Sequence, residues 1–332
     1  MVDLTTNYLG LQLKNPIIVG SSGLTDSIEK IKKLASHGAG AVVLKSIFEE
    51  EITHEYEKIM AEEAPKRYKD EFLDYLDYRI REQNLEKYVS LISGAKKEVD
   101  IPVIASVNCA SKHEWTNFAK EIEAAGADAL EVNMFVLPTN LNKTPAENEQ
   151  LYFEVIKQLK DKIKIPIAFK ISYYFSNLAY TIQQLSKSGI EGLVLFNRFY
   201  SPDFDIEKME VTSGNVLSHP DEMTMTLRWI AIMANRVNCD LVASTGVHNG
   251  EAVVKQLLAG ANAVQVVSTL YNNGPEKIQN MLKDIKKWMI GQNFEKIEDF
   301  RGKMSQAESG NPAVYERVQF MKYFSDRDKK NS

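Results

Sequence analysis

Small and polar residues stand directly after a series of short apolar runs, where a purely structural protein has little need of them. Two lysines and three asparagines are among them, which together indicate a binding site, although any single lysine could equally be a solvated surface residue. The set is Ser21-Ser22-Gly23, Lys45-Ser46, Asn108, Asn133, Lys170, Asn197, Ser244-Thr245-Gly246 and Ser268-Thr269.

The last two of these segments have the residue types of a phosphate site. Gly246 lets a backbone approach a ligand closely, and the hydroxyls of Ser244, Thr245, Ser268 and Thr269 can add donors. Backbone N–H groups at such turns often hold phosphate in parallel barrels. The alternative is an ordinary strand-to-helix turn with a Ser or Thr cap.

Two kinds of strand entry alternate along the chain and position these residues. In one, an apolar run follows a proline or polar turn, and in the other it follows a glycine suited to a helix C-cap. The first kind comprises 16–19, 102–105, 166–169 and 240–243, and the second 38–44, 126–132, 189–195 and 260–266. Nearly continuous apolar runs are typical of parallel strands covered on both faces, so the sequence predicts eight such strands.

Amphipathic segments fall between the strands. The predicted helices are 27–37, 83–99, 112–125, 145–162, 176–188, 221–237, 250–259 and 275–292. Eight strand–helix units predict a closed (β/α)₈ TIM barrel, with a doubly wound open sheet as the alternative. Polar residues that follow the strands then lie together at the C-terminal face, which is the active-site face of this fold.

The whole chain, 1–332, is predicted to be one domain with three additions to the barrel. The segment from Leu4 to Leu13 is predicted to form a hairpin that plugs the bottom of the barrel. The other two additions are an insertion after the second strand, 47–84, and a C-terminal extension, 293–332. The insertion could shape substrate access or could be a solvated helical hairpin.

Composition and motifs exclude several functions. The net charge of −5, with no basic patch, argues against a nucleic-acid partner. No long apolar run is present, so we expect no membrane partner and no signal peptide. Only Cys109 and Cys239 occur, so we expect no disulfide framework. These features predict a cytoplasmic protein. No Rossmann or P-loop motif appears, and the five histidines lack metal-ligand spacing, so no metal is expected.

From about Leu4 to Leu282 the chain resembles the dihydroorotate dehydrogenase family, the FMN-dependent barrels of pyrimidine synthesis. Order and spacing both agree. The matching stretches are 9–16 with Ser22-Gly23, 43–46, 131–133, 169–171, 196–197, 244–247 and 258–261 leading to 268–270.

The resemblance implies roles for matching positions. Ser22 and Gly23 would lie against FMN, and Lys170 would stabilise the anionic reduced ring. Lys45, Asn133 and Asn197 would contact both flavin and substrate and are the expected catalytic residues. The remaining expected FMN contacts are Ser46, Asn108, Gly214, Ser244, Thr245, Gly246, Ser268 and Thr269.

Two departures from the family concern the substrate. The family's catalytic loop carries a Cys or Ser base, but this position falls on Val136 or Leu137 here, and neither can accept a proton. Thr139, Thr144 and Cys109 are the nearest substitutes. The family's orotate-gripping Asn-x-x-Gly-Leu-Pro-Asn signature has no counterpart in the insertion.

The leading interpretation is an FMN-dependent oxidoreductase that takes hydride from a dihydroorotate-like small molecule to flavin N5. Lacking an NAD motif or iron–sulfur cysteines, it would pass electrons to a soluble acceptor or a partner protein, and family members often form homodimers. One alternative is a flavin-binding paralogue that acts on another substrate or is not catalytic. The other is a Schiff-base barrel that uses Lys170 as its amine.

Overall fold

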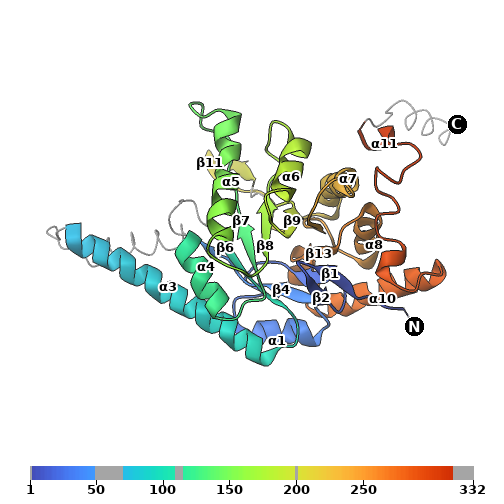
Figure 1. The fold of residues 1–332 in the computed structure, drawn as a ribbon, viewed down its shortest axis with the longest axis horizontal. Coiled ribbons are helices and arrows are strands. Elements are labelled where there is room, and N and C mark those ends of the chain that lie inside the picture. The colour runs from blue at the N-terminus through green and yellow to red at the C-terminus, as the bar shows by residue number, and fades with distance from the viewer. Residues whose placement is uncertain (1, 49–69, 109–114, 199–200, 317–332) are drawn as a thin grey trace.

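The structure, a computed structural model, describes residues 2–48, 70–108, 115–198 and 201–316. Within these ranges the eight predicted strands form one closed parallel barrel (Figure 1). They are β3 (Ile17–Val19), β4 (Ala41–Val43), β6 (Val103–Asn108), β7 (Ala129–Asn133), β8 (Ile167–Ile171), β9 (Gly192–Leu195), β12 (Asp240–Ala243) and β13 (Ala263–Val266).

Two pairings close the sheet and exclude an open, doubly wound arrangement. β13 pairs with β3, with Val264 opposite Ile17, and β4 pairs directly with β6, with Val42 opposite Val103. A two-residue strand, β5 (Ile47–Phe48), extends the ladder of β6 above this junction. The (β/α)₈ prediction is therefore confirmed.

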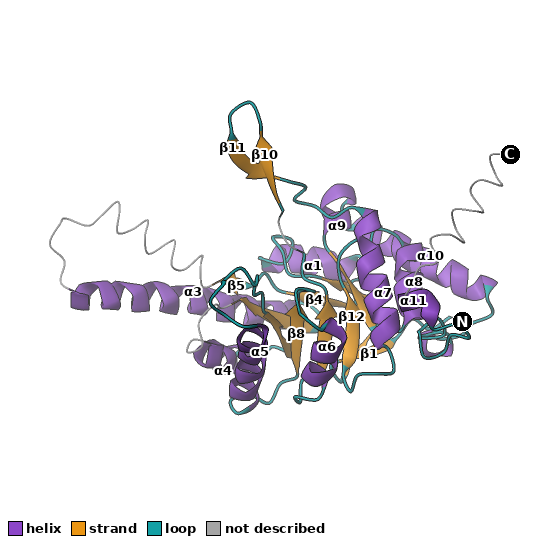
Figure 2. Cartoon of the chain, turned by 90° about the horizontal axis from the view of Figure 1, so that it is seen from above, coloured by secondary structure: helices purple, strands orange, loops and turns teal. Residues whose placement is uncertain are grey.

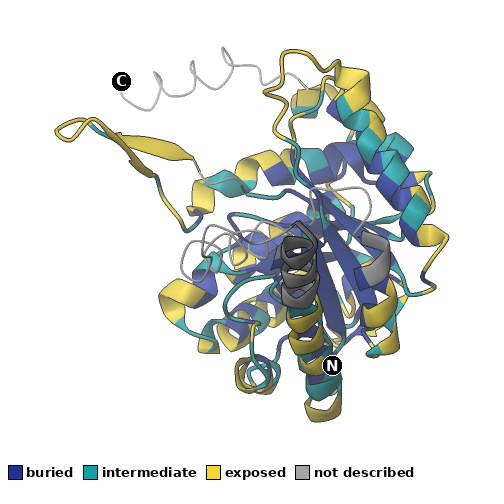
Figure 3. Ribbon diagram, turned by 90° about the vertical axis from the view of Figure 1, so that its left-hand side faces the viewer, coloured by how far each residue is buried: buried dark blue, intermediate teal, exposed yellow. Residues whose placement is uncertain are grey.

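Helices surround the barrel, with buried residues toward the strands and exposed residues on the outside (Figure 3). All eight predicted helices are present where the structure describes them. They are α1 (Ile28–Ser36), α3 (Asp70–Glu98), α4 (Trp115–Ala124), α5 (Pro145–Lys160), α6 (Leu178–Ser186), α7 (Met223–Met233), α8 (Gly250–Ala259) and α10 (Glu276–Gly291). One boundary was wrong, since α3 begins at Asp70, well inside the predicted insertion, rather than near residue 83.

The predicted N-terminal hairpin, β1 (Thr6–Tyr8) and β2 (Leu11–Leu13), is confirmed and closes the barrel at the strand starts. Its side chains Tyr8, Leu9 and Leu13 pack among the inward-facing residues of the barrel strands. Leu9 N–H donates to the Asp240 carboxylate at 2.8 Å, at the first residue of β12. The barrel bottom is thus a packed core, which leaves only the opposite face for a site.

Tyr8 offers a test of this plug. Its ring is fully buried, yet its hydroxyl has no hydrogen-bond partner among the described residues. A buried, unpaired polar group destabilises a fold, so Tyr8→Phe is expected to raise the free energy of unfolding by about 0–1.5 kcal/mol. Urea denaturation measures this difference. A loss of stability in the variant would instead mean that a water or an unseen partner satisfies the hydroxyl.

Five of the elements in the described residues lie in three regions that were not predicted to be structured. A hairpin of β10 (Pro202–Asp205) and β11 (Glu210–Ser213) stands away from the barrel (Figure 2). A short helix, α9 (Ser268–Asn273), follows β13 directly. In the C-terminal extension, η2 (Ile297–Asp299) and α11 (Ala313–Glu316) follow α10, and Ile297 and Phe300 are fully buried.

Candidate active site

A cavity of about 290 Å³ lies at the C-terminal ends of the strands, on the face opposite the plug. Seven of the predicted or neighbouring polar residues come together around it from five different strand ends. They are Ser21, Lys170, Asn197, Ser244, Thr245, Gly246 and Ser268.

Lys170 supplies the positive charge of this cavity from within β8. Its side chain is buried, and its Nζ donates to Gln265 Oε1 at 2.9 Å. Gln265 in turn donates through Nε2 to the buried Glu131 carboxylate. Burial raises the pKa of Glu131, whereas the Lys170 charge and this hydrogen bond lower it. The chain Lys170–Gln265–Glu131 therefore fixes the ammonium group at the cavity floor.

The two catalytic asparagines predicted from the sequence are in contact. Asn133 ends β7 opposite Lys170 in the strand register, and Asn197 Nδ2 donates to Asn133 Oδ1 at 2.8 Å. This bond leaves Asn197 Oδ1 and Asn133 Nδ2 as a paired acceptor and donor beside Lys170. Such a pair can hydrogen-bond an amide-like edge of a ring.

The turn after β12 forms another part of the cavity lining. Gly246 has φ +76°, and a Cβ added there would lie 2.2 Å from the Met223 backbone nitrogen, so only glycine fits. The hydroxyls of Thr245 and Thr269 are not available to a ligand as donors, because they donate to the carbonyls of Phe196 and His248.

The donors that remain in this part of the lining are backbone N–H groups and two serine hydroxyls. Within the described residues, the N–H groups of Gly246 and Val247 have no protein acceptor. Ser244 and Ser268 also line the cavity, and the Ser268 hydroxyl accepts from the Ser218 N–H. Backbone N–H groups beside a glycine can form an anion-binding concavity. The geometry therefore suits a phosphate held by the main chain and the serine hydroxyls, but not by the threonine hydroxyls that the sequence suggested.

Eight predicted residues lie outside the lining of this cavity, and Asn133 and Thr269, described above, are two of them. Ser46 is linked to it, because its N–H donates to Ser21 Oγ at 2.9 Å, and Gly23 lies against the lining residue Tyr271. Gly214 lies at the base of the β10–β11 hairpin, where its N–H donates to the Ser201 carbonyl. The other three, at the ends of their strands or loops, are Ser22, Lys45 and Asn108.

Comparison with known proteins decides the family. The family model for dihydroorotate dehydrogenase matches residues 3–289. The chain belongs to the dihydroorotate dehydrogenase family. Members of this family are flavin-dependent oxidoreductases that act on CH–CH groups, with a known role in pyrimidine biosynthesis, and this chain is an oxidoreductase of that kind.

Individual relatives are distant but align over about three quarters or more of their length. The chain is 26% identical to "Dihydroorotate dehydrogenase B (NAD(+)), catalytic subunit" of Thermoplasma volcanium, over 91% of this chain and 98% of the relative. It is 23% identical to the protein of the same name from Methanocaldococcus jannaschii, over 88% and 95%. It is also 24% identical to "Dihydropyrimidine dehydrogenase (NADP(+)), chloroplastic" of Arabidopsis thaliana, over 90% and 76%. No helix in the described part of the chain is long and apolar enough to span a membrane.

In the loop after β7, the two positions at which the family would carry its catalytic base hold the apolar residues Val136 and Leu137. Val136 is partly buried, and Leu137 is 48% exposed. The Thr144 hydroxyl is used as the N-cap of α5, where it donates to Glu147 and accepts from the Glu147 N–H. Thr139 is exposed, and Cys109 lies outside the described residues.

The sequence analysis missed three site residues. Glu131 and Gln265 are polar residues within otherwise apolar strands, which was the available signal, since a buried polar group needs a partner. Arg198 follows Asn197 and gave no such signal. Its Nε donates to Glu222 Oε2 at 2.8 Å, and its other nitrogens donate to the carbonyls of Val216 and Asn215. Arg198 thereby holds the return of the hairpin beside the cavity.

His248, two residues after Gly246, gives a pH prediction. Its Nε2 lies 3.1 Å from Ser218 Oγ, and partial burial lowers its pKa below the usual 6.5. Between 6.5 and the lower folded value, the unfolded chain binds more protons than the folded one, so stability falls as pH drops below 6.5. We expect His248→Asn to reduce this slope in urea melts taken on either side of pH 6.5. An unchanged slope would show that other groups cause it.

Proposed function

We propose that this chain holds one FMN in the cavity, with the phosphate at the Gly246 turn and the flavin ring toward Lys170. The observation that carries the proposal is that a buried ammonium group and unpaired backbone N–H groups line the same cavity. When bound, FMN supplies the hydride acceptor or donor of the family's reaction. The residues of this chain bind the flavin, fix its charge and orient a substrate at Asn133 and Asn197.

We further propose that the substrate of this chain is a small molecule with a CH–CH bond in or beside a ring, but not dihydroorotate itself. The relatives named above act on dihydroorotate or dihydropyrimidines by name. Oxidation of dihydroorotate needs a base, and the two positions that could hold it are Val136 and Leu137. A missing general base lowers a rate by about 10²–10⁴.

Anaerobic stopped-flow measurement tests this substrate assignment. We expect dihydroorotate to bleach bound FMN at most very slowly in the wild-type chain, and Val136→Cys to accelerate bleaching, whereas Val136→Ala should not. Rapid bleaching of the wild type would mean that dihydroorotate is the substrate and that a base exists elsewhere. Retained FMN without turnover of any dihydropyrimidine, imide or enone would indicate a non-catalytic flavin protein.

Electron transfer and assembly are also proposals. The relatives called catalytic subunits act with other subunits, and by analogy this chain would pass electrons to a partner protein or a soluble acceptor, in the cytoplasm. We propose that the chain forms a homodimer, which would have twice the chain mass of 37.6 kDa in light scattering. A measured mass of 37.6 kDa would contradict this proposal.

A further inference from the structure

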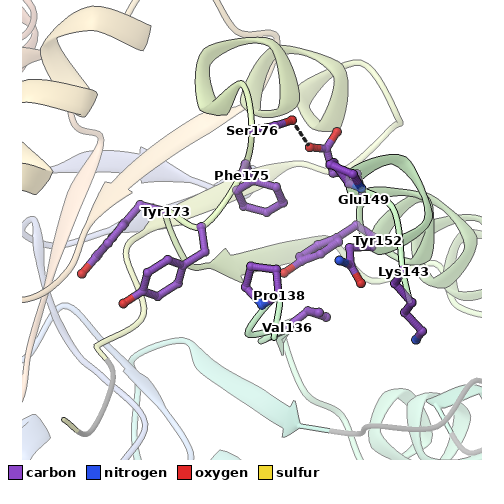
Figure 4. A pocket seen from close by; sticks show the side chains of 11 residues that line it. Val136, Pro138, Lys143, Glu149, Tyr152, Tyr173, Phe175 and Ser176 are labelled. Carbon is purple, nitrogen blue, oxygen red and sulfur yellow. Dashed lines mark hydrogen bonds between the residues drawn. The ribbon is translucent and has the colours of Figure 1, made fainter. Parts of the chain in front are cut away.

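A second cavity, of about 420 Å³, opens between the loops that follow β7 and β8 (Figure 4). Four aromatic side chains line it together with Val136 and Pro138. They are Tyr152, Tyr173, Tyr174 and Phe175. None of these side chains has a part in the proposed flavin site, so we ask what this aromatic cavity binds.

One wall of the aromatic cavity is rigid. The Tyr152 ring is 1% exposed and meets Phe175 edge-on, with ring centroids 5.2 Å apart. Its hydroxyl is hydrogen-bonded to the Val136 backbone and to Ser172, and burial raises the pKa of Tyr152 to about 12. Tyr152 therefore stays protonated and holds the β7–α5 loop with Val136 on the cavity wall.

The other wall leaves aromatic surface uncovered. Tyr173 and Tyr174 are each 39% exposed, with ring centroids 4.8 Å apart, and Tyr173 also meets Phe196 edge-on at 5.7 Å. Aromatic rings prefer offset or edge contacts with other rings, and together they make a preformed surface for a planar group. A ring-shaped ligand that entered between these walls would cover both.

The charges in this cavity do not select an anion. Lys143 and Glu149 are the charged groups among the described residues that line it, and they have opposite signs. Ser176 Oγ donates to Glu149 Oε1 at 3.0 Å, which orients that carboxylate at the rim (Figure 4). A mostly apolar cavity with a few polar rim groups is typical of a site for an uncharged small molecule.

The aromatic cavity is a neighbour of the flavin site. A smaller cavity of about 230 Å³ shares Tyr173 and Tyr174 with the aromatic cavity. The smaller cavity also shares Asn197, Arg198 and Thr245 with the proposed flavin site. A ring in the aromatic cavity would therefore lie one small cavity away from the proposed flavin site.

From this arrangement we infer that the aromatic cavity binds an uncharged, planar ring of the substrate. The inference rests on the proposed function, which it deepens by naming the substrate class. The inference also gives a role to Val136, which stands at the position of the family's catalytic base. Val136 and the nearby Pro138 would form part of the surface that binds the ring.

Coumarin, an uncharged planar unsaturated lactone, is the probe, and coumarin-3-carboxylate is its charged match. Binding to the full chain is measured by calorimetry, first without FMN and then with FMN. We expect coumarin to bind more tightly than the carboxylate.

Tyr174→Ala should weaken coumarin binding by about tenfold, since it removes one wall of the cavity, whereas Tyr174→Phe should not weaken it. Tyr180→Ala is the matched control, because Tyr180 is 59% exposed on α6 and does not line the cavity.

Several results would overturn the inference. They are equal coumarin binding by wild type and Tyr174→Ala, an equal loss in Tyr180→Ala, or tighter binding of the carboxylate. Coumarin should also shift the visible spectrum of bound FMN, and binding without a shift would contradict its place beside the flavin site. If FMN fails to bind while coumarin shows the expected pattern, the proposed function falls and the cavity remains a ring-binding site. If FMN binds and coumarin does not, only the present inference falls.

Discussion

Gly246→Ala is expected to lower the free energy of unfolding by about 2–5 kcal/mol and to weaken FMN binding by about 100-fold or more. At φ +76°, a Cβ would lie 2.2 Å from the Met223 nitrogen and 2.8 Å from its Cα. Both atoms are backbone at the start of α7, so they cannot rotate away. Either the turn or the helix must move, and the open N–H groups of Gly246 and Val247 would be displaced. Calorimetric titration with FMN and urea melts measure the two effects.

Gly126→Ala is the matched control. Gly126 has φ +91°, but an added Cβ there has no atom within 4 Å. The variant therefore carries the same backbone penalty of about 1–2 kcal/mol without the collision. It should lose that stability and bind FMN as the wild type does. If the two variants bind FMN equally well, the Gly246 turn does not hold the phosphate.

Lys170→Met is expected to make bound FMN harder to reduce, which lowers its midpoint potential, and to slow substrate turnover by about 10²–10³. The physical reason is the loss of a buried positive charge beside the position proposed for the flavin ring. A potential is the sharper measurement, because a purely structural role for Lys170 would not move it. Lys160→Met is a suitable control, since Lys160 pairs with Glu191 on the outside of the barrel.

A double variant separates this electrostatic effect from misfolding. Without Lys170, the buried Glu131 carboxyl loses the positive charge that lowers its pKa, and a buried charge left without compensation is strongly destabilising. Lys170→Met with Glu131→Gln removes both charges, so we expect it to recover stability while the FMN potential stays low. A potential that recovers together with stability would assign Lys170 to folding alone.

Much of the barrel could be predicted because its signals are local. Each strand is a short apolar run behind a proline or a glycine, and each helix has one apolar face. The β10–β11 hairpin was not predicted because its apolar residues, such as Phe204 and Val211, are exposed. The sequence of the hairpin therefore lacks the alternation that a buried strand face produces. The early start of α3 was missed because the 70–82 segment is highly charged and was assigned to the insertion, although Leu73, Leu76 and Ile80 stand at helical spacing.

The site was predictable in part for the same reason. Residues that follow strands must converge at one face once the barrel closes, which brought Lys170, Asn197 and Gly246 to one cavity. Partnerships across the barrel could not be read, because Glu131 and Gln265 are 134 positions apart and meet only through closure. The sequence also did not show that the hydroxyls of Thr245 and Thr269 donate to backbone carbonyls, because those hydrogen bonds depend on the conformation of the turns.

The central claim is that the cavity at the strand ends holds FMN, and the most direct measurement is reconstitution. Purified chain is mixed with FMN, dialysed, and examined by visible absorbance with quantitation of the released flavin. We predict the two visible bands of a flavin at one FMN per chain in the wild type and in Gly126→Ala, with loss of the bands in Gly246→Ala. A wild-type chain without flavin bands after reconstitution would contradict the account, and a covalent adduct trapped on Lys170 by borohydride would then favour Schiff-base chemistry.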